Sequence, residues 1–143
     1  MINTILCAVD VNRLTEEAEV LRRAAKIAEV EGAQLDLITV IPNYGKSMVG
    51  GYFSEDHTKK AVAKAKDLLS DFGAQTLGDE VNDKVRHIVA VGSVYHEVLT
   101  VADKDKADLI VLGAHRPDLS DYLLGPNAAR VVRHAKASVY VVR

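Results

Sequence analysis

Five short apolar runs, most of them rich in β-branched residues, alternate with segments of helical periodicity along this chain of 143 residues. The runs lie at 5–9, 35–41, 85–91, 109–112 and 139–142. They are near-continuous rather than alternating, which is typical of strands covered on both faces of a parallel sheet. Between them, apolar residues recur every three or four positions at 14–28, 61–72, 94–101 and 124–135. Because parallel strands are joined by right-handed crossovers, this order predicts an α/β fold, a doubly wound five-stranded parallel sheet with helices on both faces.

The length favours one domain spanning residues 1–143, since domains commonly have about 100–200 residues. Hydrophobic residues make up 48% and charged residues 27% of the chain, a balance that excludes a disordered or fibrous class. The formal net charge of −2 argues against a general nucleic-acid binder. No run approaches the roughly 18 apolar residues of a membrane span, so we expect no membrane association. The single cysteine, Cys7, cannot form an internal disulfide, which favours a reducing, cytoplasmic location.

Charge is distributed unevenly along the chain. Residues 1–114 carry 13 basic and 18 acidic side chains, whereas residues 115–143 carry five basic and two acidic ones. The positive C-terminal segment has two interpretations, a solvated helix face or a local anion site.

The segment around the fourth predicted strand points to a ligand. Gly113 ends that strand, and a glycine there lets a ligand approach the backbone closely. Gly125 precedes the last predicted helix, whose first-turn N–H groups suit a phosphate. His115 and Arg116 add side-chain donors at the same edge. The pattern predicts an anion site, and the alternative is a glycine-punctuated connection with an incidental arginine.

Signatures of other common sites are incomplete. Gly45-Lys46-Ser47 lacks the earlier glycine of a P-loop, and His96-Glu97 lacks the second histidine of a zinc-protease helix. Neither a Gly-x-Ser-x-Gly elbow nor a Gly-x-Gly-x-x-Gly turn occurs. We therefore expect no metal site and no catalytic residues.

The sequence resembles the universal stress protein family over essentially the whole chain. The segment from Thr4 to Asp10 is similar to the family's first strand, which ends in an aspartate. Residues 107–115 are similar to its fourth strand, and 131–143 to its final helix and strand. The resemblance implies the strand order 3-2-1-4-5 and a site for ATP or another adenine nucleotide, alone or with Mg²⁺.

The family's ATP-binding members carry a Gly-x-x-Gly-x₉-Gly-Ser/Thr pattern, which this chain matches in part. Gly113 and Gly125 are present, but Arg116 stands at the second glycine and only eight residues separate it from Gly125. This shorter version is itself similar to a subgroup of small bacterial members. Pro126 replaces the Ser or Thr and removes an N–H and a hydroxyl donor. At about 1.5–3 kcal/mol for a hydrogen bond to a charged group, we expect binding to weaken about ten- to a hundred-fold.

The resemblance also assigns roles to individual residues. The nucleotide's phosphates are expected in the segment that contains Gly113, His115, Arg116, Gly125, Pro126 and Asn127. Asp10 resembles the family residue near the ribose or adenine, and the alternative is a helix-entry cap. Val40 and Ile41 match positions at which the family's backbone meets adenine, although their side chains also fit a core. Ala8 replaces a proline that is frequent in the family.

The last strand, with Val139, Tyr140, Val141 and Val142, lies at the sheet edge in the implied order. Most of its length carries no charged side chain that would discourage pairing with another strand. Family members pair this strand across a two-fold axis. A homodimer is therefore expected, with capping of the edge by loops as the alternative.

Together these inferences predict a cytoplasmic, homodimeric sensor or regulator that binds ATP. Two alternatives stay open: an interaction module with a vestigial pocket, favoured by Pro126, and a slow ATPase or phosphotransferase in which Asp10 holds Mg²⁺. The long connection from Pro42 to Ser54 is expected to be either a contact loop over the site or a mobile link.

Overall fold

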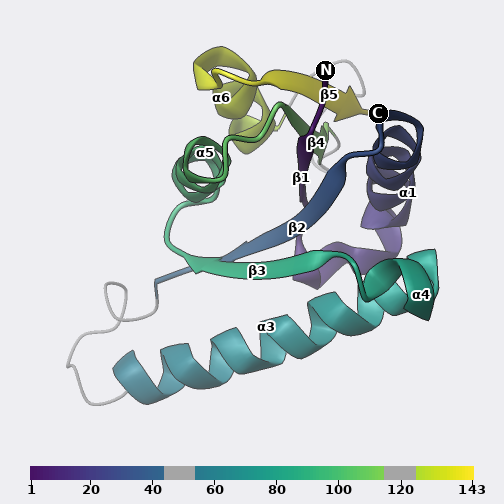
Figure 1. Cartoon of the computed structure of the whole chain (residues 1–143). Helices are drawn as coiled ribbons and strands as arrows, with labels where there is room; N and C mark the ends of the chain where they lie inside the picture. Colours follow the sequence, from purple (N-terminus) through teal and green to yellow (C-terminus); the bar gives the residue numbers. More distant parts are fainter. Residues whose placement is uncertain (44–53, 115–124) are drawn as a thin grey trace.

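The computed structural model describes residues 1–43, 54–114 and 125–143, and the segments 44–53 and 115–124 lie outside the described residues. The connection from Pro42 to Ser54, expected to be either a contact loop over the site or a mobile link, lies almost wholly in the first of these segments. Within the described residues, a central sheet is flanked by helices (Figure 1).

Five parallel strands form the sheet in the order β3-β2-β1-β4-β5, which confirms the predicted fold and strand order. Their bounds are β1 Thr4–Ala8, β2 Gln34–Ile41, β3 Arg86–Val91, β4 Leu109–Gly113 and β5 Ser138–Val142. In the register, Cys7 at the centre of the sheet pairs with Leu37 of β2 and with Val111 of β4.

In the described ranges, four helices of eight residues or more cover the two faces of the sheet, each where helical periodicity predicts one. They are α1 Leu14–Glu31, α3 Ser54–Leu77, α5 Val94–Lys104 and α6 Pro126–His134. Buried side chains of α1 and α3 share one core with β1, whereas those of α5 and α6 share a second core on the opposite face. β1 serves both cores, because Ile5 and Cys7 point to the first and Leu6 to the second, all with no exposed surface.

Among the residues that the structure describes, two short helical segments have no counterpart in the apolar pattern, the 3₁₀ turn η1 Val11–Arg13 and α4 Asp79–Asn82. The helix α3 also begins before its apolar stripe, at residue 54 rather than 61. Its first turns project past the end of β3 (Figure 1), and residues 56, 57, 59 and 60 are exposed. A helical segment without a core to cover needs no apolar periodicity.

Gly73 lies inside α3, although the sequence allowed either Gly73 or Gly78 to end this helix. An added Cβ on Gly73 would lie 2.0 Å from Oδ1 of Asn82, so the glycine makes room for a buried amide. That amide donates from Nδ2 to the carbonyl of Ser70 at 3.0 Å, and its Oδ1 lies 2.7 Å from Nε2 of His87. Gly78, with φ of +87°, follows the last residue of the helix.

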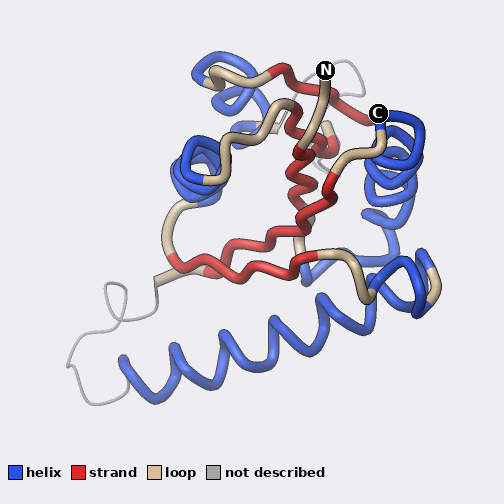
Figure 2. The backbone as a smooth tube through the Cα atoms, viewed as in Figure 1, coloured by secondary structure: helices blue, strands red, loops and turns tan. Residues whose placement is uncertain are grey.

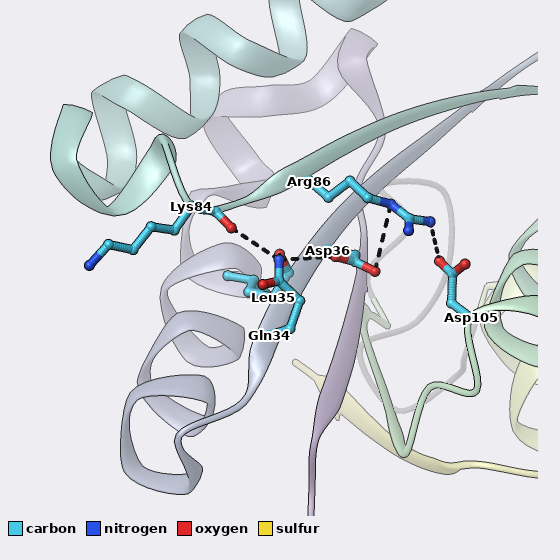
Figure 3. A network of polar contacts seen from close by, with 6 residues as sticks. All are labelled: Gln34, Leu35, Asp36, Lys84, Arg86 and Asp105. Carbon is cyan, nitrogen blue, oxygen red and sulfur yellow. Dashed lines mark hydrogen bonds and ion pairs between the residues drawn. The ribbon is translucent and has the colours of Figure 1, made fainter.

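A polar network closes the amino end of the sheet (Figure 3). Gln34 donates from Nε2 to Oδ1 of Asp36 at 3.3 Å and to the carbonyl of Lys84 at 3.0 Å. Arg86 donates to Asp105 at 2.5 Å, and its Nε lies 4.0 Å from Oδ2 of Asp36. Burial raises the pKa of Asp36, while Gln34 and Arg86 act to lower it. Because these groups satisfy one another, we interpret the network as structural.

No helix in the described ranges is long and apolar enough to cross a membrane.

Candidate functional site

The chain turns to opposite faces of the sheet after two neighbouring strands, β1 and β4. After β1 it enters η1 and α1 on one face, and after β4 it continues toward α6 on the other. Figure 2 shows α1 and α6 on opposite sides of the central strands. In open parallel sheets such a switch point leaves a crevice at the carboxyl ends of the two strands, where ligands bind. We take this crevice as the candidate site.

The start of α6 lies directly beside the end of β4. Ala114, which follows β4, donates its N–H to the carbonyl of Val142 at 2.8 Å and accepts the N–H of Gly125 at 3.2 Å. The bond from Gly125 to Ala114 holds the start of α6 next to the end of β4, so Gly113 and the N-terminus of α6 lie at the same carboxyl edge of the sheet. The positive end of the helix dipole therefore faces the crevice, as an anion site requires. His115 and Arg116, which were predicted to donate here, lie outside the described residues.

The supply of backbone donors at α6 is smaller than the sequence suggests. Gly125 is the N-cap, and its N–H is already used by Ala114. Pro126, at the first helical position, is exposed and has no N–H. Asn127 and Ala128 keep N–H groups that the helix itself leaves without a partner. Asn127 is half-buried and Ala128 is buried, and neither N–H bonds to another described residue, so two backbone donors remain for an anion within the part of the chain that the structure describes.

Asp10 follows β1 and has a structural task of its own. Its Oδ1 accepts the N–H of Asn12 at 2.9 Å and caps η1, as the helix-entry alternative predicted. The side chain is exposed at the carboxyl edge of the sheet. The cap uses one of the two carboxylate oxygens.

The three apolar candidates divide between the two faces. Ala8 and Val40 are half-buried and pack on the core beneath α5 and α6. Ile41 is buried, and its side chain lies on the other face, since neighbours along a strand alternate. Its carbonyl accepts the N–H of Gly92 at 2.9 Å. Ala8 and Val40 therefore form an apolar wall near the crevice, and Ile41 contributes to the core.

Glu17 of α1 is a residue at this edge that the sequence reading missed. Its Oε1 accepts the N–H of Asp10 at 3.3 Å. An added Cβ on Gly113 would lie 3.3 Å from its Oε2. Burial raises the pKa of Glu17 from its usual 4.5 to about 7, with the N–H of Asp10 and the charge of Arg13 opposing the rise. The signal in the sequence is a carboxylate three residues after Leu14 and four before Leu21, on the apolar stripe of the predicted helix.

A cavity of about 200 Å³ adjoins Glu17 on the face covered by α1. It lies between the start of α1 and the ends of β4 and β5, and its lining includes Arg13, Glu16, Gly113, Val142 and Arg143. Among the described residues no group of three His, Cys, Asp or Glu side chains could hold a metal ion.

Comparison with known proteins points to one family. The model of the universal stress protein family matches residues 1–143. Universal stress protein G of Escherichia coli O157:H7 is 30% identical over 149 residues, with 100% of both chains covered. The solved structure of MJ0577, a universal stress protein of Methanocaldococcus jannaschii, superposes with a TM-score of 0.79 at 25% identity. That superposition covers 99% of this chain and 96% of the other.

Two further solved structures with this fold contain an adenine nucleotide. A universal stress protein in complex with cAMP has a TM-score of 0.64 at 23% identity, covering 99% of this chain and 97% of that one. The universal stress protein of Archaeoglobus fulgidus in complex with dAMP has a TM-score of 0.60 at 22% identity, with 100% of both chains covered. At these identities the likeness concerns the fold, and the ligands belong to those two proteins.

Proposed function

Because this chain belongs to the universal stress protein family, we propose that it is a homodimeric sensor or regulator that binds ATP or another adenine nucleotide at the switch point. The observation that carries the proposal is the 3.2 Å bond between Gly125 and Ala114. It holds the N-terminus of α6, with its two available N–H groups, against the end of β4. The complexes of related folds with cAMP and dAMP support an adenine nucleotide as the ligand.

The residues present fit such a ligand. Asn127 and Ala128 offer backbone donors at the positive end of α6, which the bond between Gly125 and Ala114 holds beside the end of β4. Ala8 and Val40 offer an apolar surface for the base. Together these groups would bind and orient a nucleotide without providing a nucleophile or a base for its hydrolysis.

Arg116 and His115 complete the proposed phosphate site from the segment outside the described residues. An arginine can donate two parallel hydrogen bonds to phosphate oxygens and would offset part of the loss at Pro126. Asp10, at the end of β1, is proposed to face the ribose or the base.

The outer edge of β5 supports the proposed homodimer. β5 pairs with β4 on one side, where Ser138 donates its N–H and Val142 accepts through its carbonyl. In a parallel pair the alternate residues, here Val139 and Val141, turn their N–H and C=O groups the other way. Tyr140 remains 36% exposed. An edge with apolar side chains and unpaired backbone groups is suited to pairing with a second copy.

The nucleotide proposal is tested by denaturing the purified protein, identifying any released nucleotide by chromatography, and titrating the emptied protein with ATP and Mg²⁺. Two substitutions at the start of α6 make the test specific. Pro126→Ser restores an N–H and a hydroxyl and should tighten binding about ten- to a hundred-fold. Asn127→Pro removes one N–H and should weaken it about tenfold, while the matched variant Asn127→Ala keeps that N–H and should bind nearly as the unaltered protein does.

An affinity that neither Pro126→Ser nor Asn127→Pro changes would place the phosphates elsewhere. If millimolar ATP produces no binding, the nucleotide proposal is wrong. The interaction module is then favoured, and it has one observation behind it already. Pro126 lacks an N–H and the N–H of Gly125 is occupied, so α6 keeps only two of its first donors for a ligand.

A further inference from the structure

The bonds between β5 and β4 determine which backbone groups of β5 face outward. Ser138, at the start of β5, donates its N–H toward β4 at 3.3 Å, and Val142, at its end, accepts the N–H of the residue that follows β4 at 2.8 Å. Alternate residues of a strand turn their N–H and C=O groups to the same side, so Tyr140, midway between these two, also faces β4. The outward groups within β5 are therefore those of Val139 and Val141. Among the described strands, β5 pairs with β4 alone.

A two-fold axis restricts how a second copy can pair with this edge. An axis at Tyr140 sets Val139 against Val141 of the second copy and Val141 against its Val139, so that every outward group within β5 has a partner. An axis at Val139 or at Val141 sets one outward residue against a position outside β5. Full use of the edge therefore selects Tyr140, which is the midpoint of Ser138–Val142.

The side chain at this axis is the aromatic ring of Tyr140. Tyr140 would occupy a non-hydrogen-bonded position of the antiparallel pair, where opposite Cα atoms are about 4.5 Å apart and side chains lie close together. Its ring is on the face of α1 and is 36% exposed, whereas Val139 and Val141 pack on the core of the other face. An axis at Tyr140 therefore brings the exposed rings of two copies side by side.

Arg23 of α1 holds the Tyr140 side chain in position. Its Nη1 donates to the Tyr140 hydroxyl at 3.0 Å, and its Nε donates to Oε1 of Glu19 at 2.8 Å. A side chain that is already restrained loses less conformational freedom when a partner binds. The neighbouring Arg22 also lies near Glu19, at 3.7 Å, but does not contact Tyr140 within the described ranges.

We propose that two copies of this chain pair antiparallel along β5 with the two-fold axis at Tyr140, so that the two Tyr140 rings pack side by side and Arg23 orients each ring. The inference rests on the homodimer of the proposed function. It adds the register of the strand pair and the side chains that favour a second copy as the partner of this edge.

Cysteine cross-linking tests the register. Tyr140→Cys places two thiols across the axis at a separation that allows a disulfide, so mild oxidation should give a covalent dimer on a non-reducing gel. Val139→Cys and Val141→Cys should give little covalent dimer, since neither residue lies opposite itself. Cys7 is buried and present in every variant, and the unaltered protein measures its contribution. A covalent dimer from Val139→Cys or Val141→Cys but not from Tyr140→Cys overturns the proposed register.

Matched arginine variants test the part of Arg23. Arg23→Ala releases the Tyr140 hydroxyl and should raise the Kd of the dimer about fivefold in sedimentation equilibrium. Arg22→Ala makes the same change of charge and should leave the Kd nearly unchanged. In a Tyr140→Phe protein, which lacks the hydroxyl, Arg23→Ala should have no further effect. Equal effects of the two arginine substitutions, or an effect of Arg23→Ala that persists in Tyr140→Phe, contradict the role assigned to Arg23.

A measurement on the unaltered protein covers a variant that folds poorly. In a mixture of ¹³C-labelled and unlabelled protein, isotope-filtered NMR should show a contact between the Hα protons of Tyr140 in the two copies, because opposite Cα atoms approach most closely at such a position. A dimer that lacks this contact overturns the inference and leaves the homodimer standing. A protein that sediments as a monomer at every concentration overturns the homodimer and the inference with it.

Discussion

Replacing Glu17 by glutamine should stabilise the protein at pH 8 and leave its stability near pH 4 almost unchanged. The carboxyl group titrates near 4.5 in an unfolded chain and near 7 in the folded one. Between these two values the folded state binds more protons than the unfolded state. The free energy of unfolding therefore falls as the pH rises through this window, and the loss is complete above about pH 7. Glutamine carries no charge at any pH and escapes this loss.

The magnitude follows from the gap between the two pKa values. Each pKa unit corresponds to about 1.4 kcal/mol, so the gap between the two pKa values corresponds to at most about 3.5 kcal/mol. Glu17 is half-buried rather than fully enclosed, and solvent screening lowers the expected gain to about 2 kcal/mol. The bond from the N–H of Asp10 contributes little to the difference, because the glutamine carbonyl accepts it equally well.

Urea unfolding at a series of pH values from 4 to 8.5 measures this difference, at one protein concentration so that assembly does not alter the comparison. The gain from Glu17→Gln should grow from near zero at pH 4.5 to about 2 kcal/mol at pH 8. Glu16→Gln, which alters an exposed carboxylate, should show no such growth. A gain that is independent of pH, or a loss at pH 8, would refute the assignment of a raised pKa to Glu17. Equal gains in both variants would assign the effect to overall charge.

Two further predictions concern Gly73 and the edge of β5. Gly73→Ala should lower the free energy of unfolding by about 2–3 kcal/mol despite the better helix propensity of alanine, because the new methyl group displaces the amide of Asn82 from its partners. In urea unfolding, the double variant with Asn82→Ala should lose less than the sum of the two single variants, and strict additivity would show that the clash lies elsewhere. Val141→Pro should weaken the proposed dimer, since it removes an outward N–H, whereas Val141→Ala keeps that N–H and should remain dimeric. Sedimentation velocity distinguishes them, and a Val141→Pro protein that stays dimeric would place the interface on another surface.

The central sheet and its four main helices could be predicted because their signals are local. A buried parallel strand such as β4 has a continuous apolar run in the sequence. The helix α1 has apolar residues at helical spacing and ends at Gly32, whose φ of +66° only glycine adopts easily. The start of α3 could not be predicted this way, since its exposed first turns carry no apolar period. Gly73 was ambiguous for a related reason. Its role depends on Asn82, nine residues away, which no local pattern connects to it.

Some features of the candidate site could likewise be recognised in the sequence, and others could not. The glycines at the end of β4 and before α6 were recognisable in the sequence as candidates, because a glycine next to a strand end or a helix start is a local signal. Which N–H groups remain available was not, because the partner of Gly125 is Ala114, at the other end of a segment of ten residues. Glu17 was overlooked because a single carboxylate on an apolar stripe resembles an ordinary exception to the pattern.

The sequence by itself determined the class of fold and the alternation of strands and helices, and it predicted a ligand site at the carboxyl edge of the sheet. These properties follow from periodicity, glycine placement and the handedness of crossovers, which each segment carries within itself. The tertiary structure alone decided that Asp10 caps η1, that α6 retains two donors, and that Glu17 from α1 lies between the ends of β1 and β4. The burial of a side chain and the partner of each hydrogen bond depend on segments that are distant in the sequence. They are therefore fixed only when folding packs those segments together.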